Sequence, residues 1–147
     1  MALQIMMVAL GCAVGGVARF LLGKGVNAQP WASDGFPWAT LIINVAGSIC
    51  LGIVAEFYLE RESSSFRMET YLLLGTGFCG GFTTFSSFSL EMLNLIKAGA
   101  ILPSMAYAIS SVLLSLLLPA ESSDAFAQQL RNLSAGAIQI TSPDSGN

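Results

Sequence analysis

Histidine is absent from this sequence, and charged residues make up only 10% of its 147 positions, against about 25% in a typical soluble domain. Since histidine is the commonest general base and the commonest metal ligand, the serine–histidine–aspartate and cysteine–histidine sets of hydrolytic enzymes cannot form. The three cysteines, Cys12, Cys50 and Cys79, each lie in an apolar stretch, and their spacing fits no zinc motif. We therefore do not expect an enzyme, and we interpret the cysteines as small buried hydrophobic residues.

Apolar residues take the place of the missing charge, because 54% of the chain is hydrophobic. A chain this short presents most of its residues to its surroundings, so a composition of this kind indicates lipid surroundings. The net charge is −3 and the six basic residues are scattered, which leaves no basic patch for a nucleic acid. We predict an all-α membrane protein whose first partner is the lipid bilayer.

Four segments are long and apolar enough to cross a bilayer as helices, since a span requires roughly 20 residues. They cover residues 3–23, 37–59, 68–96 and 100–118. We interpret the first as a retained helix, because a signal peptide would begin with basic residues and end in a small-residue cleavage site. Pro119 is expected to end the fourth helix, so that residues 1–118 form a transmembrane domain and residues 119–147 a polar tail.

The positive charges do not favour one orientation in the membrane. With four spans, both termini and the loop after the second span share one side. The three basic residues on that side are Arg61, Arg67 and Arg131, and the three toward the other side are Lys24, Lys97 and Arg19. The positive-inside rule fixes orientation only where one side has an excess. Two alternatives remain, an antiparallel pair of chains inserted both ways or a single orientation set by one dominant loop.

The third span contains residues that a lipid-facing helix does not need. Four glycines lie between Gly75 and Gly81, and five hydroxyl residues follow between Thr83 and Ser89. Glycine costs about 1 kcal/mol relative to alanine inside a helix, and non-helical backbone is tolerated at membrane depth only inside protein or a water-filled cavity. Either the helix is interrupted and frees carbonyls that coordinate sodium, or Gly77 and Gly81 serve close helix packing.

Phenylalanines and hydroxyl residues are interleaved in the same segment. Phe82, Phe85 and Phe88 are three residues apart, so they lie along one side of a helix. A phenyl ring carries partial positive charge at its edge, and ring edges beside hydroxyl donors would suit a small, hard anion. Ordinary packing of an aromatic stripe is the alternative.

Two other spans carry polar side chains at a spacing of four, which places each set on one face of a helix. These are Thr40, Asn44 and Ser48 in the second span and Tyr107, Ser111 and Ser115 in the fourth. One such track is commonly a helix–helix contact, whereas three tracks on three spans indicate a polar path.

Two charged residues, Arg19 and Glu91, also lie within the predicted spans, where burying a charge is costly. We expect both to have structural roles, with a place at an aqueous vestibule as the alternative for Arg19.

Three stretches of the sequence resemble the Fluc (CrcB) fluoride channel family. They are Gly-Gly-Val-Ala-Arg-Phe at 15–20, Thr-Leu-Ile-Ile-Asn-Val-Ala-Gly-Ser at 40–48 and Gly-Phe-Cys-Gly-Gly-Phe-Thr-Thr-Phe-Ser-Ser-Phe-Ser at 77–89. The last is the most specific, and the resemblance covers residues 3–118.

The tail, residues 119–147, departs from the family pattern, because family members end soon after the fourth span. In the tail, Phe126, Leu130 and Leu133 recur at helical spacing, which allows a short interfacial helix or a disordered tail.

The resemblance implies a dual-topology antiparallel homodimer of four-helix chains, with the third helix interrupted. It implies one cofactor, a structural sodium ion at the dimer centre, held by the backbone carbonyls of Gly80 and Thr83. It implies a fluoride path past Asn44, Phe85 and Phe88. Further path-lining hydroxyls would be those of Ser87, Tyr107 and Ser111.

The function implied by the resemblance is passive, fluoride-selective export across the inner (plasma) membrane of a prokaryotic cell. Neutral HF enters from acid surroundings and ionises inside, and the negative interior then drives the anion out. A small multidrug-type antiporter is an alternative, but it requires a carboxylate in the first helix, where this chain has Arg19 and no acid. A non-transporting membrane scaffold would explain the glycines and apolar spans but not three aligned polar tracks.

Overall fold

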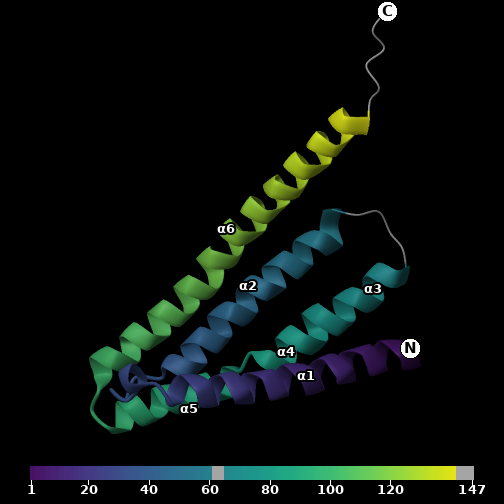
Figure 1. Cartoon of the computed structure of the whole chain (residues 1–147). Coiled ribbons are helices and arrows are strands. Elements are labelled where there is room, and N and C mark those ends of the chain that lie inside the picture. Colours follow the sequence, from purple (N-terminus) through teal and green to yellow (C-terminus); the bar gives the residue numbers. More distant parts are fainter. Residues whose placement is uncertain (61–64, 142–147) are drawn as a thin grey trace, which may run out of the picture.

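The computed structural model describes residues 1–60 and 65–141, with side chains at 1–58, 68–120 and 128. Every regular element of these described residues is helical (Figure 1). The elements are α1 (Ala2–Asn27), η1 (Pro30–Ala32), α2 (Trp38–Glu60), α3 (Ser65–Tyr71), the π-helical η2 (Leu72–Cys79), α4 (Gly80–Phe82), α5 (Phe85–Lys97) and α6 (Ile101–Thr141). Arg61, Arg67 and Arg131, on which the count of positive charges depends, lie outside the described side chains.

Three of the described helices are long and apolar enough to cross a membrane. Their candidate spans are Ala2–Asn27, Trp38–Tyr58 and Ile101–Ala120, with mean hydropathies of 2.1, 2.0 and 2.0. Much of their apolar surface is exposed in the single chain, and Leu10, Val14 and Val17 of α1 are each more than half exposed. Continuous apolar surface of this extent belongs in lipid, so the prediction of an all-α membrane protein is confirmed.

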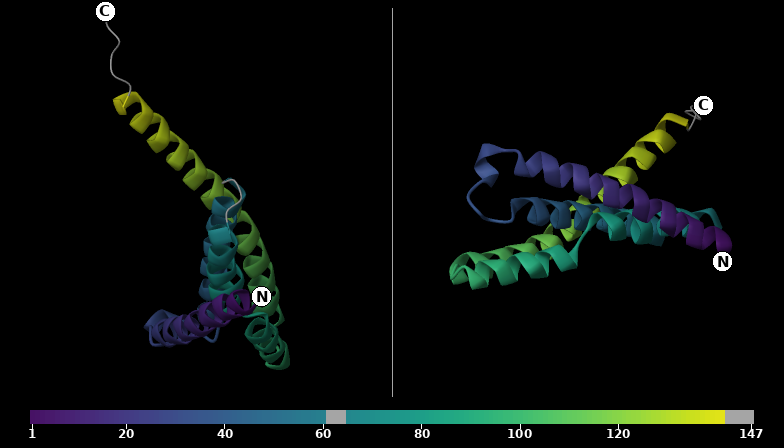
Figure 2. Two further views of the ribbon diagram at one scale, coloured as in Figure 1. Left: turned by 90° about the vertical axis from the view of Figure 1, so that its right-hand side faces the viewer. Right: turned by 90° about the horizontal axis from the view of Figure 1, so that it is seen from below.

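The helices pair with partners that are distant in sequence. In each view α2 lies beside α6, and the segment from α3 to α4 lies beside α1 (Figures 1 and 2). Few large side chains are buried; Ile43 of α2, Phe82 of α4 and Tyr107 of α6 are among them. The small core therefore holds the helices side by side and leaves broad faces uncovered.

Glycines bring α1 into backbone contact with η2 and α4. A methyl group added at Gly11 would overlap the carbonyl oxygen of Leu73, and one added at Gly15 would overlap that of Phe78. On the other side, a Cβ at Gly77 would lie 2.9 Å from the Cα of Gly11, and one at Gly81 would lie 2.5 Å from the Cys12 carbonyl oxygen. Gly77 and Gly81 thus serve the close packing that their spacing allows.

This packing predicts opposite outcomes for two adjacent glycines. Gly15→Ala places a methyl group against a backbone carbonyl that cannot move aside, and we expect a loss of about 1–3 kcal/mol of stability. Gly16→Ala is the matched control, because its Cβ meets nothing within 4 Å. Thermal unfolding in detergent should show a lower Tm for Gly15→Ala and an unchanged or slightly higher Tm for Gly16→Ala. Equal Tm values would contradict the close contact.

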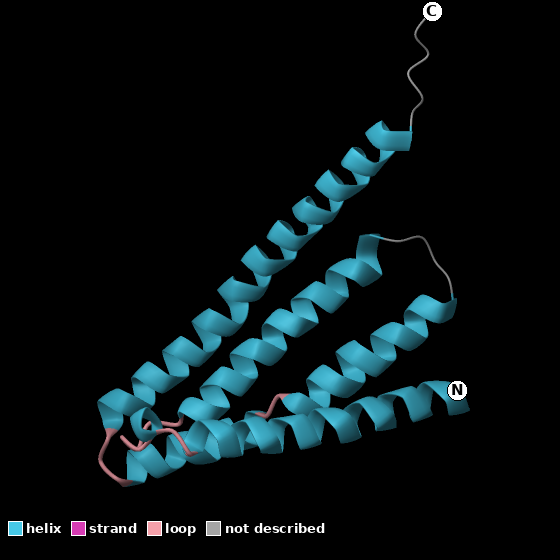
Figure 3. Ribbon diagram, in the orientation of Figure 1, coloured by secondary structure: helices cyan, strands magenta, loops and turns pink. Residues whose placement is uncertain are grey.

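The backbone between α4 and α5 is extended for two residues (Figure 3). Thr83 has φ −77° and ψ 161°, and Thr84 has φ −151° and ψ 115°. Thr84 then caps α5, because its Oγ1 accepts the Ser87 N–H at 3.2 Å. The glycines from Gly75 to Gly81 are helical, so the extended residues are the two threonines that follow them.

The expected end of the fourth helix at Pro119 is wrong. α6 passes through Pro119 and continues to Thr141, so it has 41 residues. A Cβ added at Gly52 of α2 would lie 3.0 Å from the Pro119 Cβ, so the proline packs where α2 has no side chain. Pro119 has no backbone N–H, so the helix loses one hydrogen bond at this position. The contact with α2 supports the helix there. In Figure 1, α6 extends well past the other helices. Phe126, Leu130 and Leu133 lie outside the described side chains.

Candidate ion pathway

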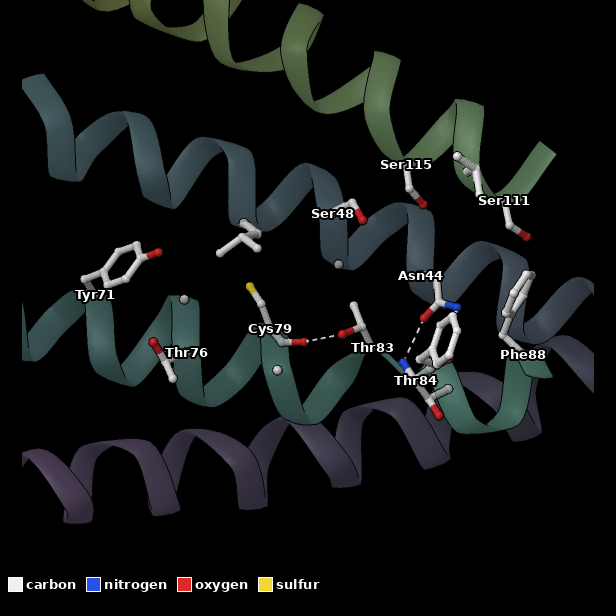
Figure 4. Close-up of a pocket in the computed structure, with 16 residues that line it drawn as sticks. Asn44, Ser48, Tyr71, Thr76, Cys79, Thr83, Thr84, Phe88, Ser111 and Ser115 are labelled. Carbon is white, nitrogen blue, oxygen red and sulfur yellow. Dashed lines mark hydrogen bonds between the residues drawn. The ribbon is translucent and has the colours of Figure 1, made fainter. Parts of the chain in front are cut away.

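Asn44 holds the extended residues after α4. Its Nδ2 donates to the Thr84 carbonyl at 3.1 Å. Its Oδ1 accepts the Thr84 N–H at 2.8 Å, which is the bond drawn between the two residues in Figure 4. The side-chain amide therefore replaces, for one residue, the partners that a continuous helix would supply. One of the two Nδ2 hydrogens is used in this pair, which leaves the second available as a donor.

Asn44 lines an open groove of about 540 Å³ between α2, α6 and the segment from α3 to α5. Six of the residues predicted from the sequence line it together. They are Asn44, Gly80, Thr83, Phe85, Phe88 and Ser111. Ser48 and Ser115, the next members of the two polar tracks, line it as well, so the tracks of α2 and α6 face one another across the groove.

Ser111 contributes an unpaired hydroxyl to this groove. Its side chain is 6% exposed, and its Oγ has no hydrogen-bond partner among the described residues. Figure 4 shows Ser111 and Ser115 projecting from α6 toward the side of α2 that carries Asn44. A buried hydroxyl without a partner is unfavourable unless water or an ion binds there, so this position favours an exogenous hydrogen-bond acceptor or donor.

The three phenylalanines have different surroundings. Phe82 is buried, with 9% of its surface exposed, and its ring stacks on Phe78 at 5.6 Å between centroids. Phe85 is 79% exposed in the single chain, and its ring lies 5.7 Å from that of Phe88. Phe88 in turn lies 5.0 Å from Tyr107. Packing thus accounts for Phe82, whereas Phe85 and Phe88 present rings to the groove.

Glu91 is paired with two hydroxyls inside the helix bundle. Thr40 Oγ1 donates to Glu91 Oε1 and Tyr107 Oη donates to Glu91 Oε2, each at 2.7 Å. Thr40 and Tyr107 are both buried. The arrangement joins α2, α5 and α6 through one carboxylate. It also commits the Tyr107 hydroxyl to a carboxylate, so this hydroxyl is not directed to an ion in the groove.

A second cavity, of about 780 Å³, lies on the other side of the extended residues. Arg19, Lys24, Ser86 and Ser87 are among its lining residues, so the structure places Ser87 here and not in the Asn44 groove. Arg19 Nη1 donates to the Thr83 carbonyl at 3.3 Å. Two cationic side chains beside hydroxyls and the first turn of α5 give the cavity a positive character.

Thr84 is the functional candidate that sequence reasoning missed. It separates the two cavities, caps α5 and makes both backbone hydrogen bonds with Asn44. One sequence feature does indicate its role: a threonine directly before a helix is a typical N-cap, which predicts that a helix begins at Phe85.

Comparison with known proteins places the chain in a family. The family model described as "CrcB-like protein, Camphor Resistance (CrcB)" matches residues 6–120. The chain belongs to this family. A protein of Nitrobacter winogradskyi named "Fluoride-specific ion channel FluC" is 45% identical over 111 residues, which are 76% of this chain and 85% of the relative.

Further relatives carry the same name. The protein of Rhizobium meliloti is 41% identical over 114 residues, covering 78% of this chain and 88% of the relative. That of Coxiella burnetii is 46% identical over 99 residues, covering 66% and 76%. With three apolar helices and bacterial relatives, the prediction of a multi-pass prokaryotic membrane protein of the CrcB family is confirmed.

Proposed function

We propose that this CrcB-family chain is a fluoride-selective ion channel, and not an enzyme, that lets cytoplasmic fluoride leave passively across the plasma membrane. The observation that carries the proposal is the groove in which Asn44, Phe85, Phe88 and the unpaired Ser111 hydroxyl come together. The three relatives named as fluoride-specific channels support the choice of ion.

The groove supplies what a dehydrating fluoride ion requires. An anion that leaves water must exchange its hydrogen bonds for others, because an unpaired ion in a low-dielectric interior is prohibitively unstable. The second Nδ2 hydrogen of Asn44 and the Ser111 hydroxyl are donors, and the edges of Phe85 and Phe88 add weaker positive charge between them. Separate weak sites allow the ion to bind and also to leave. A larger halide gains less from these donors, which gives selectivity.

Four spans and an antiparallel dimer belong to the same proposal. The segment from α3 to α5 supplies the remaining span, which is the third in chain order, with the extended residues Thr83 and Thr84 as its interruption. Such backbone at membrane depth requires protein or water around it, whereas the groove is open and Phe85, which lines it, is 79% exposed in the single chain. A second chain of opposite orientation would cover the groove, which agrees with the equal numbers of positive residues on the two sides of the membrane.

The sodium ion is a further part of the proposal, and the carbonyls at the interruption fit it. In a continuous helix the Thr84 N–H would bond the Gly80 carbonyl, but here it bonds Asn44. The Thr83 carbonyl accepts Arg19 with one lone pair and keeps the other. Both residues line the open groove, and two chains would offer four oxygens, the ligand type that hard cations prefer. When bound, the ion would supply fixed positive charge near the anion path.

Ion efflux from liposomes tests the proposal. Purified protein is reconstituted with internal fluoride or chloride, and a potassium ionophore cancels the voltage that an electrogenic flux creates. We expect fluoride efflux without any proton gradient, and chloride efflux no faster than from protein-free liposomes. Equal fluxes of the two halides, or a requirement for a proton gradient, would show that the proposed function is wrong.

A further inference from the structure

The loop between α1 and α2 is tied together by one carboxylate. Asp34 Oδ1 accepts the Phe36 N–H at 2.9 Å, and the Trp38 indole Nε1 lies 3.1 Å from each carboxylate oxygen. Gly35, between them, has φ +83°, a conformation that glycine adopts without strain. A single acidic side chain therefore fixes both the turn and the first residue of α2.

The ring held by this turn reaches the helix bundle. Phe36 lies 4.6 Å from Trp38 and contacts Tyr107 edge-on, with centroids 5.6 Å apart and an interplanar angle of 80°. Phe88 contacts the same Tyr107 ring at 5.0 Å. Tyr107 is fully buried, and its hydroxyl bonds Glu91. Its ring is thus held by an aromatic neighbour from the loop, by one from the groove and by its own hydroxyl bond.

We propose that Phe36, fixed by Asp34, is a positioning residue that holds the Tyr107 ring and, through it, the Phe88 ring that lines the ion path. The inference rests on the proposed fluoride channel. Edge-to-face contacts have defined geometry, so removing the Phe36 ring lets Tyr107 tilt. Phe88, which lines the groove, then loses the fixed neighbour that positions its ring.

The Asp34 anchor is suited to acidic surroundings. The N–H of Phe36 and then the Trp38 indole hold the pKa of Asp34 below its usual value of 3.8. A carboxylate with a lowered pKa in the folded state contributes its stabilisation above its usual pKa and loses it only as the pH falls through the lower value. The turn therefore stays tied in mildly acidic media.

A double-mutant cycle on flux tests the proposal in the full-length protein in liposomes. Phe36→Leu keeps apolar bulk but removes the ring, and we expect fluoride flux per reconstituted protein to fall about fivefold, the factor that ~1 kcal/mol represents. In a Tyr107→Leu background the same substitution should change flux by less than about twofold, since Phe36 then has no ring to hold. Trp31→Leu is the control: Trp31 lies in the same loop and contacts Trp38 at 6.1 Å, and flux should match the parent.

The outcomes of this cycle separate the positioning role of Phe36 from the proposed channel function. If the losses of Phe36→Leu and Tyr107→Leu multiply, or if Phe36→Leu conducts like the parent, the inference is overturned while the proposed function stands. If the parent conducts no fluoride, the proposed function fails and the inference with it. Should Phe36→Leu not fold, Asp34→Ala keeps the ring and removes its anchor, and it should lower flux in the parent but not in the Tyr107→Leu background.

Discussion

Asn44→Asp is expected to abolish fluoride flux, with a loss of about a hundredfold or more. Asp keeps the shape of Asn and the acceptor for the Thr84 N–H, but it replaces the donor to the Thr84 carbonyl, now bonded at 3.1 Å, by an oxygen. An ionised oxygen would then face a carbonyl oxygen and the anion path. A buried hydrogen-bonding group that loses its partner costs about 1–3 kcal/mol, and more when one of the groups is charged. Each ~1.4 kcal/mol added to the barrier lowers the flux by a factor of ten.

Gln29→Glu is the matched control for this substitution. It makes the same exchange of an amide for a carboxylate, since Gln29 Nε2 donates to a backbone carbonyl, that of Gly25, at 3.2 Å on the exposed surface. Flux from this variant should equal that of the parent, measured with a fluoride electrode at equal amounts of reconstituted protein. Comparable flux from Asn44→Asp and Gln29→Glu would remove Asn44 from the ion path.

Replacement of the groove phenylalanines by isoleucine is expected to lower fluoride flux about tenfold for each ring, an increase of ~1.4 kcal/mol in the barrier. Phe85→Ile and Phe88→Ile keep an apolar side chain but remove the aromatic ring from the groove lining. Phe82→Ile should act differently, because that ring is buried against Phe78. It should cost roughly 1–3 kcal/mol of stability and leave the flux of the folded protein close to that of the parent.

The contrast requires two measurements on the same preparations. Tm in detergent reports the packing role, and initial efflux rate at equal amounts of folded protein reports the path. A set of three variants with equal flux would mean that the aromatic stripe is packing throughout and that the polar tracks alone carry the ion.

The composition was sufficient to predict the broad architecture, because an all-helical membrane fold depends on the average character of many residues and not on any single one. A chain with so little charge and such long apolar segments could not cover them in a soluble fold. Accordingly, α1, α2 and the first half of α6 lie within a few residues of the ranges predicted for the first, second and fourth spans. The spacing of Gly77 and Gly81 left a close helix contact as one of two alternatives. The structure has this contact, because α1 brings its own glycines, Gly11 and Gly15, against the same segment.

Features set by distant partners were beyond sequence reasoning. The extended conformation of Thr84 depends on a side chain 40 residues away, Asn44, and no local pattern encodes that pair. The helix continues through Pro119 because α2 offers a bare surface at Gly52, so tertiary packing overrides a local rule. The family resemblance implied that the Tyr107 hydroxyl lines the path, but this hydroxyl donates to Glu91, which lies on another helix.

The π-helical conformation of Leu72–Cys79 affects how this segment tolerates insertions and deletions. Bonds from residue i to i+5 accommodate more residues per turn than an α-helix, so such a stretch is equivalent to an α-helix with a residue inserted. Removing one residue would restore ordinary α-helical bonding at little local cost. The α-helical segments on either side would then keep roughly their present alignment. By contrast, removing one residue from an α-helical stretch such as α5 would rotate its two ends by about 100° relative to each other, because each α-helical residue turns by that angle. The π-helical stretch should therefore tolerate the loss of one residue better than the α-helical segments beside it.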